Sequence, residues 1–210
     1  AGEVEDLWNN LSDGGTALMP LDKYPFSDRY GWIQDKYGVS WQLILPQQKA
    51  PQKVMPSMLF VNEVYGKAEE AIQYYTSIFH NTKVGTIARY PGGMEPDKEG
   101  TIMYADFMLE GQWFAAMDSA HNHKFHFNEA ISLMVHCDTQ EEIDYYWDKL
   151  TKEGKEVQCG WLCDKYGVAW QVTPTIMLKL LQGEDKEKAK RAMQAMMTMV
   201  KLDIAKLENA

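Results

Sequence analysis

An internal repeat limits the fold of this chain more than any other feature of its sequence. Residues 31–43 read GWIQDKYGVSWQL and residues 160–172 read GWLCDKYGVAWQV, so nine of the thirteen aligned positions are identical. Upstream of each copy, apolar residues recur with the i, i+3, i+4, i+7 spacing of a helix that buries one face. They are Val4, Leu7, Trp8 and Leu11 before the first copy, and Ile143, Tyr146, Trp147 and Leu150 before the second. The chain therefore contains one structural unit at least twice.

The second copy shows the order of elements within the unit. An apolar run at 130–136 predicts a strand, and Thr139 followed by Glu142 forms a capping box that predicts the start of a helix. Gly154 predicts the end of this helix. Short strands around the turn at 164–167 complete the unit, which therefore reads strand, helix and then several strands.

A third unit fits between the two copies. The sequence predicts a helix at 68–79 that buries Ala71, Ile72, Tyr75 and Phe79. It predicts strands at 58–62 and near 82–90, 101–110 and 112–118. Each unit is then a βαβββ module, and two paired modules form a curved mixed sheet around a cleft. We predict an α+β fold in which residues 57–174 make one complete domain of two modules.

The segments that flank this domain differ from it. Residues 1–46 read as the second half of a preceding repeat, an incomplete domain without the strand that should precede its helix. Residues 47–56 predict a linker and residues 175–210 a helical C-terminal arm. A half-module exposes a sheet face and an unpaired edge, so another element must cover it. One hypothesis is that Ala1 is not the natural start and that about a hundred further residues complete a first domain; the alternative is docking of 1–46 on the main domain or on another copy.

Composition narrows the classes of function. The formal net charge of −9 disfavours nucleic acid as a partner, because the phosphate backbone would be repelled. There is no apolar run long enough to span a membrane and no leader-like segment after Ala1, so we expect a cytoplasmic protein without membrane contact. Three cysteines do not indicate a disulfide framework.

The segment from Phe125 to Pro174 resembles a known family. Its core reads FNEAIS, then VHCDTQEEIDYYWDKL, then QCGWLCDKYGVAWQVTP. This string is similar to the PhnB-like group of the vicinal-oxygen-chelate superfamily, also called the glyoxalase/bleomycin-resistance superfamily, a group that is often labelled demethylubiquinone methyltransferase. The resemblance extends over 57–208. It implies the paired βαβββ fold, a cleft in each domain and a homodimer.

The resemblance does not imply a particular chemistry. Metal-dependent members of the superfamily hold a divalent ion with His, Glu or Gln side chains from four strands that face the cleft. The corresponding positions here are Pro56, Ala105 or Asp106, Glu129 or Ala130, and Gln171. This set has no imidazole, so we predict no metal site. We also predict no cofactor, because a Rossmann-type methyltransferase needs a glycine-rich strand-to-helix turn and no glycine here has that context.

Candidate site residues cluster before the second module. Alternation along an extended strand would place Phe125, Phe127 and Glu129 on one face. If the phenyl rings line the cleft, the Glu129 carboxylate is desolvated, its pKa rises, and it becomes a candidate catalytic base. The alternative is a surface carboxylate paired with a lysine.

Further candidate ligand-binding residues come from other strands. Gln171 occupies the last of the superfamily's metal-ligand positions, so we expect its amide to face the cleft. Trp113 is either core or a ligand platform, and Arg89 is either a site for an anionic group or a solvated charge. We interpret the chain as a small-molecule-binding protein whose ligand the sequence does not identify. The alternatives are a metal-dependent lyase, isomerase or dioxygenase, or a metal-free enzyme with Glu129 as base.

Overall fold

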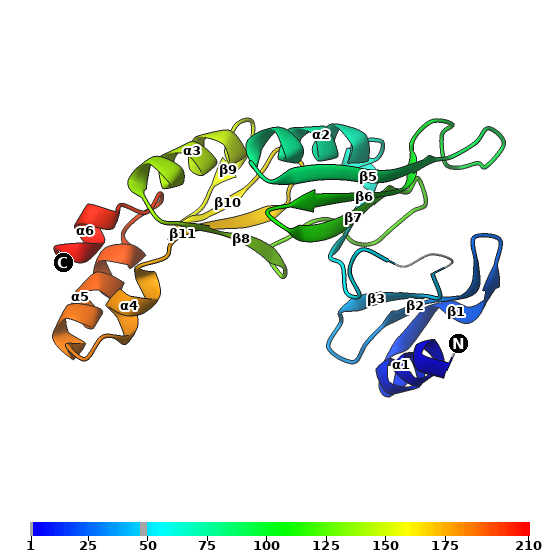
Figure 1. Cartoon of the computed structure of the whole chain (residues 1–210), viewed down its shortest axis with the longest axis horizontal. Helices are drawn as coiled ribbons and strands as arrows, with labels where there is room; N and C mark the ends of the chain where they lie inside the picture. The colour runs from blue at the N-terminus through cyan, green and yellow to red at the C-terminus, as the bar shows by residue number, and fades with distance from the viewer. Residues whose placement is uncertain (1, 47–49) are drawn as a thin grey trace. The chain divides into compact units, whose positions relative to one another are not determined.

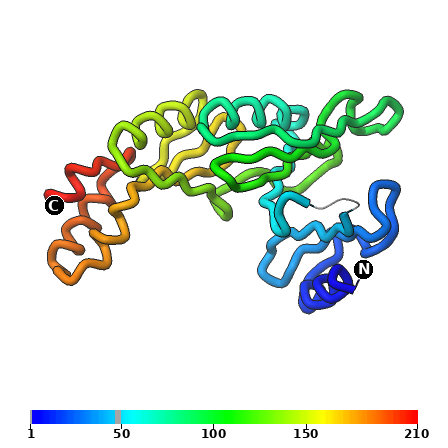
Figure 2. Tube along the Cα trace, in the orientation of Figure 1, coloured from blue at the N-terminus to red at the C-terminus, as the bar shows by residue number. Residues whose placement is uncertain are grey.

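The computed structural model describes residues 2–46 and 50–210 (Figures 1 and 2). It divides into two compact units, Ala1–Val54 and Met55–Ala210, which we call unit 1 and unit 2. No helix in the described ranges combines the length and the apolar character needed to cross a membrane.

Unit 1 is a helix followed by a three-stranded antiparallel sheet. Its elements are α1 (Gly2–Ser12), β1 (Thr16–Tyr24), β2 (Ser27–Gln34) and β3 (Ser40–Ile44), with strand order β1-β2-β3. The helix packs against the sheet where the indole of Trp8 lies over Gly31. A Cβ at position 31 would lie 2.6 Å from that ring, so glycine permits the close approach.

The first module of unit 2 contains four strands and one long helix. Its elements are β4 (Ser57–Phe60), the 3₁₀ turn η1 (Asn62–Val64), α2 (Ala68–Ile78), β5 (Thr82–Arg89), β6 (Ile102–Leu109) and β7 (Gln112–Asp118). The strand order is β4-β7-β6-β5, with β4 parallel to β7 and the other pairs antiparallel. The buried carboxylate of Asp118 caps the helix start, since its Oδ1 accepts the backbone N–H groups of Gly66 (2.9 Å) and Ala68 (3.2 Å).

The second module repeats this plan. Its elements are β8 (Ser132–Cys137), α3 (Gln140–Leu150), β9 (Lys155–Glu156), β10 (Trp161–Cys163) and β11 (Ala169–Pro174), in the order β8-β11-β10-β9. Thr139 caps α3 by accepting the N–H of Glu142 at 3.3 Å, as the capping box predicts. The second hydrogen bond of the capping box differs from the expected one, because the Glu142 carboxylate accepts the backbone N–H of Asp138 instead of that of Thr139. The first strand begins at Ser132, two residues later than the sequence indicated.

Unit 1 and the second module each contain a glycine at which the end of the helix lies close to the backbone of the following hairpin. A Cβ on Gly15, after α1, would lie 2.7 Å from the carbonyl oxygen of Gln34, just before the DKYG turn. A Cβ on Gly154, after α3, would collide in the same way with the carbonyl oxygen of Cys163. Because both helices end against the backbone of their own hairpin, the two repeats agree in structure as well as in sequence.

The two modules of unit 2 share one hydrophobic core. Helices α2 and α3 lie side by side (Figures 1 and 2), and the hydroxyl of Tyr145 on α3 donates to the carbonyl of Ile78 at the end of α2. Phe79 stacks on Tyr146 at 5.2 Å and on Trp170 at 5.7 Å between ring centroids. The residues predicted to face inward from the first helix, Ala71, Ile72, Tyr75 and Phe79, are all buried. Packing between the modules therefore involves their helix-bearing sides.

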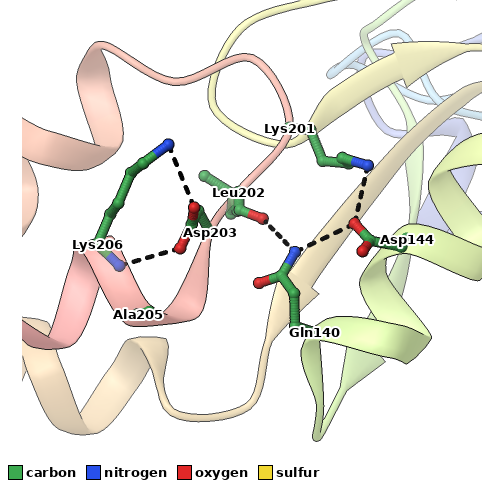
Figure 3. A pocket seen from close by; sticks show the side chains of 7 residues that line it. All are labelled: Gln140, Asp144, Lys201, Leu202, Asp203, Ala205 and Lys206. Atoms are coloured by element: carbon green, nitrogen blue, oxygen red, sulfur yellow. Dashed lines mark hydrogen bonds and ion pairs between the residues drawn. The ribbon is translucent and has the colours of Figure 1, made fainter.

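The C-terminal arm is helical and has a small core of its own. It contains α4 (Met177–Gln182), α5 (Lys186–Met197) and α6 (Ile204–Glu208), which enclose Met177, Leu202 and Leu207. The amide of Gln140 fastens the arm to α3, donating to the carbonyl of Leu202 at 3.2 Å and accepting the N–H of Ile204 at 2.9 Å. The small pocket in Figure 3, about 340 Å³, lies at this junction. Its polar groups bond one another, which suits attachment of the arm better than ligand binding.

Candidate functional site

A pocket of about 460 Å³ lies where the two modules of unit 2 meet, and we call it the inter-module pocket. Its lining residues are Val61, Glu63, Val64, His126, Phe127, Glu153, Gly154, Lys155, Asp164, Lys165, Tyr166 and Gly167. The apolar part of the lining consists of Val61, Val64 and the rings of Phe127 and Tyr166. Phe60 lies behind both rings, with centroids 5.2 Å from Phe127 and 5.9 Å from Tyr166. The volume falls within the range of small-molecule sites.

Charged side chains surround the apolar part. Glu63, Glu153 and Lys155 are exposed, so water screens each of these charges. Lys165 is more enclosed; its ammonium group pairs with Glu70 at 2.9 Å and lies 4.9 Å from the ring centroid of Tyr74. The pocket thus combines an aromatic wall with separated charges of both signs.

Asp164 is the most buried ionisable group beside the pocket. Its Oδ1 accepts the backbone N–H groups of Tyr166 (2.9 Å) and Val168 (3.1 Å), and its Oδ2 accepts the indole N–H of Trp170 (2.9 Å) and the hydroxyl of Tyr75 (2.7 Å). Burial raises the pKa of Asp164 above its usual value, and these four donors oppose the rise. All donors come from the protein, so this carboxylate organises the pocket wall and is not directed at a ligand.

Glu70 ties the turn of the second module to α2. Its carboxylate bonds Lys67 (2.7 Å), Lys165 (2.9 Å) and the hydroxyl of Tyr166 (2.9 Å). These hydrogen bonds lower the pKa of Glu70 to about 2, with the largest contribution from Lys67. The carboxylate therefore stays ionised at neutral pH, which makes it a structural ion and a poor proton carrier.

The expected alignment of Phe125, Phe127 and Glu129 is wrong. Residues 119–131 form no strand, so side-chain alternation does not apply there. Phe127 does line the pocket, whereas Phe125 is 42% exposed and its ring lies 4.9 Å from that of His123. Glu129 is exposed and is not desolvated among phenyl rings.

Glu129 instead lies beside a thiol. Its Oε1 is 3.9 Å from the Sγ of Cys163, which pairs across the sheet with Lys155 at the pocket. Burial raises the pKa of the Cys163 thiol, and the nearby Glu129 carboxylate raises it further. A thiol held protonated in this way is a weak nucleophile. A catalytic role for Glu129 stays a prediction.

Gln171 and Trp113 lie on sheet faces outside the pocket. Gln171 shares the face of its sheet opposite α3 with Trp161, and its amide donates to the hydroxyl of Ser132 at 2.8 Å. Trp113 lies on the face of its own sheet opposite α2, under the ammonium of Lys83 at 5.9 Å from the ring centroid. The structure therefore brings Phe127 alone of the predicted ligand-binding residues into the pocket.

Arg89 is held by an ion pair. Its guanidinium makes two hydrogen bonds to the carboxylate of Glu69, at 2.7 and 2.8 Å, and a third to the carbonyl of Gly100 at 3.0 Å. The pairing raises the pKa of Arg89 and lowers that of Glu69. The expectation of a guanidinium available to an anionic ligand is corrected, because these contacts neutralise it.

The residues at the superfamily's metal-ligand positions do not fit a divalent ion. Pro56 has no side-chain donor atom, and the Oδ1 of Asp106 accepts the N–H of Thr86 at 2.8 Å within an irregular stretch of β5. Glu129 lies beside the thiol of Cys163, and the amide of Gln171 donates to the hydroxyl of Ser132. Among residues 2–46 and 50–210, there is no group of three or more His, Cys, Asp or Glu side chains that could hold a metal.

Sequence reasoning missed the Asp164 network. A signal was present, since each copy of the repeat places an aspartate six residues before a tryptophan, Asp35 before Trp41 and Asp164 before Trp170. In both copies the aspartate accepts the indole N–H at 2.9 Å. The repeated spacing therefore encodes a side-chain hydrogen bond across the hairpin.

Comparison with known proteins places the chain in a family. Residues 1–44 and 52–173 match the sequence model of the 3-demethylubiquinone-9 3-methyltransferase family. The chain belongs to this family. A PhnB protein from Bacillus cereus, described as a 3-demethylubiquinone-9 3-methyltransferase, has 42% sequence identity and a TM-score of 0.54, and the match covers 59% of this chain and all of the other.

Two further solved structures match with lower sequence identity. A protein from Pseudomonas aeruginosa is 19% identical with a TM-score of 0.49, covering 59% of this chain and 97% of its own. The fosfomycin resistance protein FosX from Listeria monocytogenes, solved with manganese and sulfate, is 13% identical with a TM-score of 0.40, covering 64% and 98%. No curated protein matches the chain. The PhnB-like assignment and the α+β fold of paired modules are confirmed.

Proposed function

We propose that this member of the 3-demethylubiquinone-9 3-methyltransferase family is a small-molecule-binding protein that works without a catalytic metal. The observation that supports the proposal is the inter-module pocket, in which Phe127 and Tyr166 form an aromatic wall beside the rim charges Lys155 and Glu153. Such a site gains affinity from burial of an apolar group and orientation from a few polar contacts. The expected ligand is a small molecule with one aromatic or aliphatic part and one polar end.

Catalysis finds less support in the same residues. The buried carboxylate of Asp164 is saturated by four protein donors, and Glu129 is exposed. The methyl transfer in the family's name would need a methyl-donor site, and the connection from β4 to α2 carries the single glycine Gly66 instead of a glycine-rich turn. A homodimer and a cytoplasmic location stay predictions.

The first test uses the anionic fluorescent probe 8-anilinonaphthalene-1-sulfonate, whose aromatic rings and sulfonate match the wall and Lys155. Replacing Phe127 with alanine should weaken probe binding to the full chain about tenfold, because a ring contact worth about 1.4 kcal/mol is lost. Fluorescence titration measures the dissociation constant. Phe125→Ala is the matched control, since this ring lies outside the pocket, and it should change the constant less than about twofold.

Equal effects of the two substitutions would contradict a binding site at this pocket. A folding defect in the Phe127 variant would also weaken binding, so Phe127→Leu serves as a second variant that keeps the apolar contact with Phe60. Its affinity should lie between those of the original chain and the alanine variant.

The second test concerns metal. We expect elemental analysis of the purified full chain, dialysed against each divalent cation in turn, to give well below one ion per chain. The physical reason is the ligand set at the superfamily positions, where Pro56 offers no donor and Asp106 is bonded to the backbone. A stoichiometric divalent ion that survives dialysis would reject the metal-free proposal and favour the lyase or dioxygenase alternative.

A further inference from the structure

Two sulfur atoms from distant parts of unit 2 lie in contact near its surface. The Sγ of Cys159, in the turn between β9 and β10, is 3.9 Å from the Sδ of Met197 at the end of α5. The two residues are 38 positions apart in the sequence, and we call their sulfur atoms the sulfur pair. Met197 is 57% exposed, so this contact does not serve to fill the core.

The backbone on both sides of the sulfur pair is held in place. The N–H of Cys159 donates to the carbonyl of Met199 at 2.8 Å, and the N–H of Gly160 donates to the carbonyl of Val200 at 2.8 Å. Cys159 and Gly160 both have positive φ, at 61° and 80°, as the two central residues of a tight hairpin turn do. The turn and the segment after α5 are therefore fastened to each other beside the sulfur pair.

A third sulfur atom belongs to the same face of α5. Met193 precedes Met197 by four residues, and side chains at this spacing are neighbours on a helix. Met193 is 41% exposed, so solvent reaches both thioethers. Because methionine has three rotatable bonds, the Met193 thioether can turn toward an ion held by the sulfur pair.

The chemistry of these atoms selects a soft metal ion. Thiolate and thioether ligands favour Cu(I), whereas magnesium, calcium and manganese favour oxygen ligands. Two metal–sulfur bonds of about 2.3 Å that meet at about 120° place their sulfur atoms about 4 Å apart. The sulfur pair already has this separation, at 3.9 Å, so an ion can bind with little movement of either residue.

We propose that Cys159 and Met197 form a binding site for one Cu(I) ion, with Met193 as the third ligand. The Cys159 thiol gives its proton to water when the ion binds, so the ligands are one thiolate and two thioethers. None of these three residues lines the inter-module pocket. A monovalent ion at this place is therefore separate from the proposal that the pocket works without a catalytic metal.

Competition for Cu(I) tests the proposal. The full chain, kept reduced and free of oxygen, is titrated with Cu(I) held by the chromophoric chelator bicinchoninate, and we expect one ion bound per chain. Cys159→Ser should abolish binding. Met197→Leu, which nearly keeps the volume of the side chain, should weaken binding at least about tenfold because the ion loses a ligand.

Cys163→Ser and Met94→Leu are the matched controls. Cys163 is another partly buried thiol, and Met94 is another exposed methionine. Each substitution should change the affinity for Cu(I) less than about twofold. No binding in competition with bicinchoninate, unchanged binding by Met197→Leu, or equal losses in Cys163→Ser and Cys159→Ser would each overturn the proposal.

X-ray absorption at the copper edge tests the ligands without any substitution. When the methionines of the chain are replaced by selenomethionine, we expect copper–selenium scattering beside copper–sulfur scattering. A bound copper ion without selenium neighbours would overturn the proposal, because thiols alone would then hold the ion.

Discussion

Asp164→Asn is expected to lower the free energy of unfolding of unit 2 by about 3 kcal/mol. The amide can keep one oxygen on the N–H groups of Tyr166 and Val168, but its NH₂ group then faces the buried indole N–H of Trp170. A donor that loses its only acceptor away from water is costly. Hydrogen exchange of peptides from α3, followed through urea unfolding, measures the loss in unit 2.

Asp35→Asn in unit 1 is the matched control for Asp164→Asn. The replaced carboxylate makes the same three bonds, but it is half exposed, so water can satisfy the indole of Trp41. Its pKa is lowered, mainly by the hydrogen bond from Trp41, whereas burial raises the pKa of Asp164. We expect a clearly smaller loss of stability than at Asp164, read from peptides of β2. Similar losses at both sites would show that cover by α2 contributes little.

Gly154→Ala should destabilise unit 2 by about 3 kcal/mol as well. A Cβ at this position would collide with the carbonyl oxygen of Cys163 and lie 3.0 Å from backbone atoms of Asp164, so the end of α3 must move away from β10. Backbone cannot rotate aside as a side chain can. The same exchange experiment on α3 peptides measures the effect.

Two other glycines test this explanation for Gly154. Gly92→Ala in the same unit should cost less than about 0.5 kcal/mol, because the nearest atom is the mobile end of the Glu99 side chain. Gly15→Ala should destabilise unit 1, since its Cβ would meet the carbonyl oxygens of Leu11 and Gln34. A stable Gly154 variant, or a Gly15 variant indistinguishable from the original chain, would argue against equivalent repeats.

The regular part of the fold follows from sequence patterns. The helix predicted at 68–79 occurs at Ala68–Ile78. The strands predicted near 82–90 and 101–110 agree with β5 and β6 to within one residue at each end, and the strand predicted at 112–118 coincides with β7. These elements are predictable because burial imposes a period of 3.6 or 2 on the sequence. The repeat then predicts the topology, because the order of helices and strands in one copy gives their order in the other copy.

The candidate site was harder to predict. The stretch 119–131 looked extended from its alternating aromatic residues, but its backbone is held by side chains, such as Asn62, which donates to the carbonyls of His123 and Phe125. Long-range bonds of this kind leave no local period. The partner of Arg89 was invisible for the same reason, because Glu69 lies twenty residues away on a helix.

We expect the inter-module pocket of unit 2 to receive a small molecule against the Phe127 and Tyr166 rings. A crystal structure of the full chain soaked with 8-anilinonaphthalene-1-sulfonate measures this directly. We expect one probe molecule with its aromatic rings against Phe127 and its sulfonate toward Lys155. An empty pocket, with the probe bound instead on the sheet faces around Gln171 or Trp113, would contradict the claim.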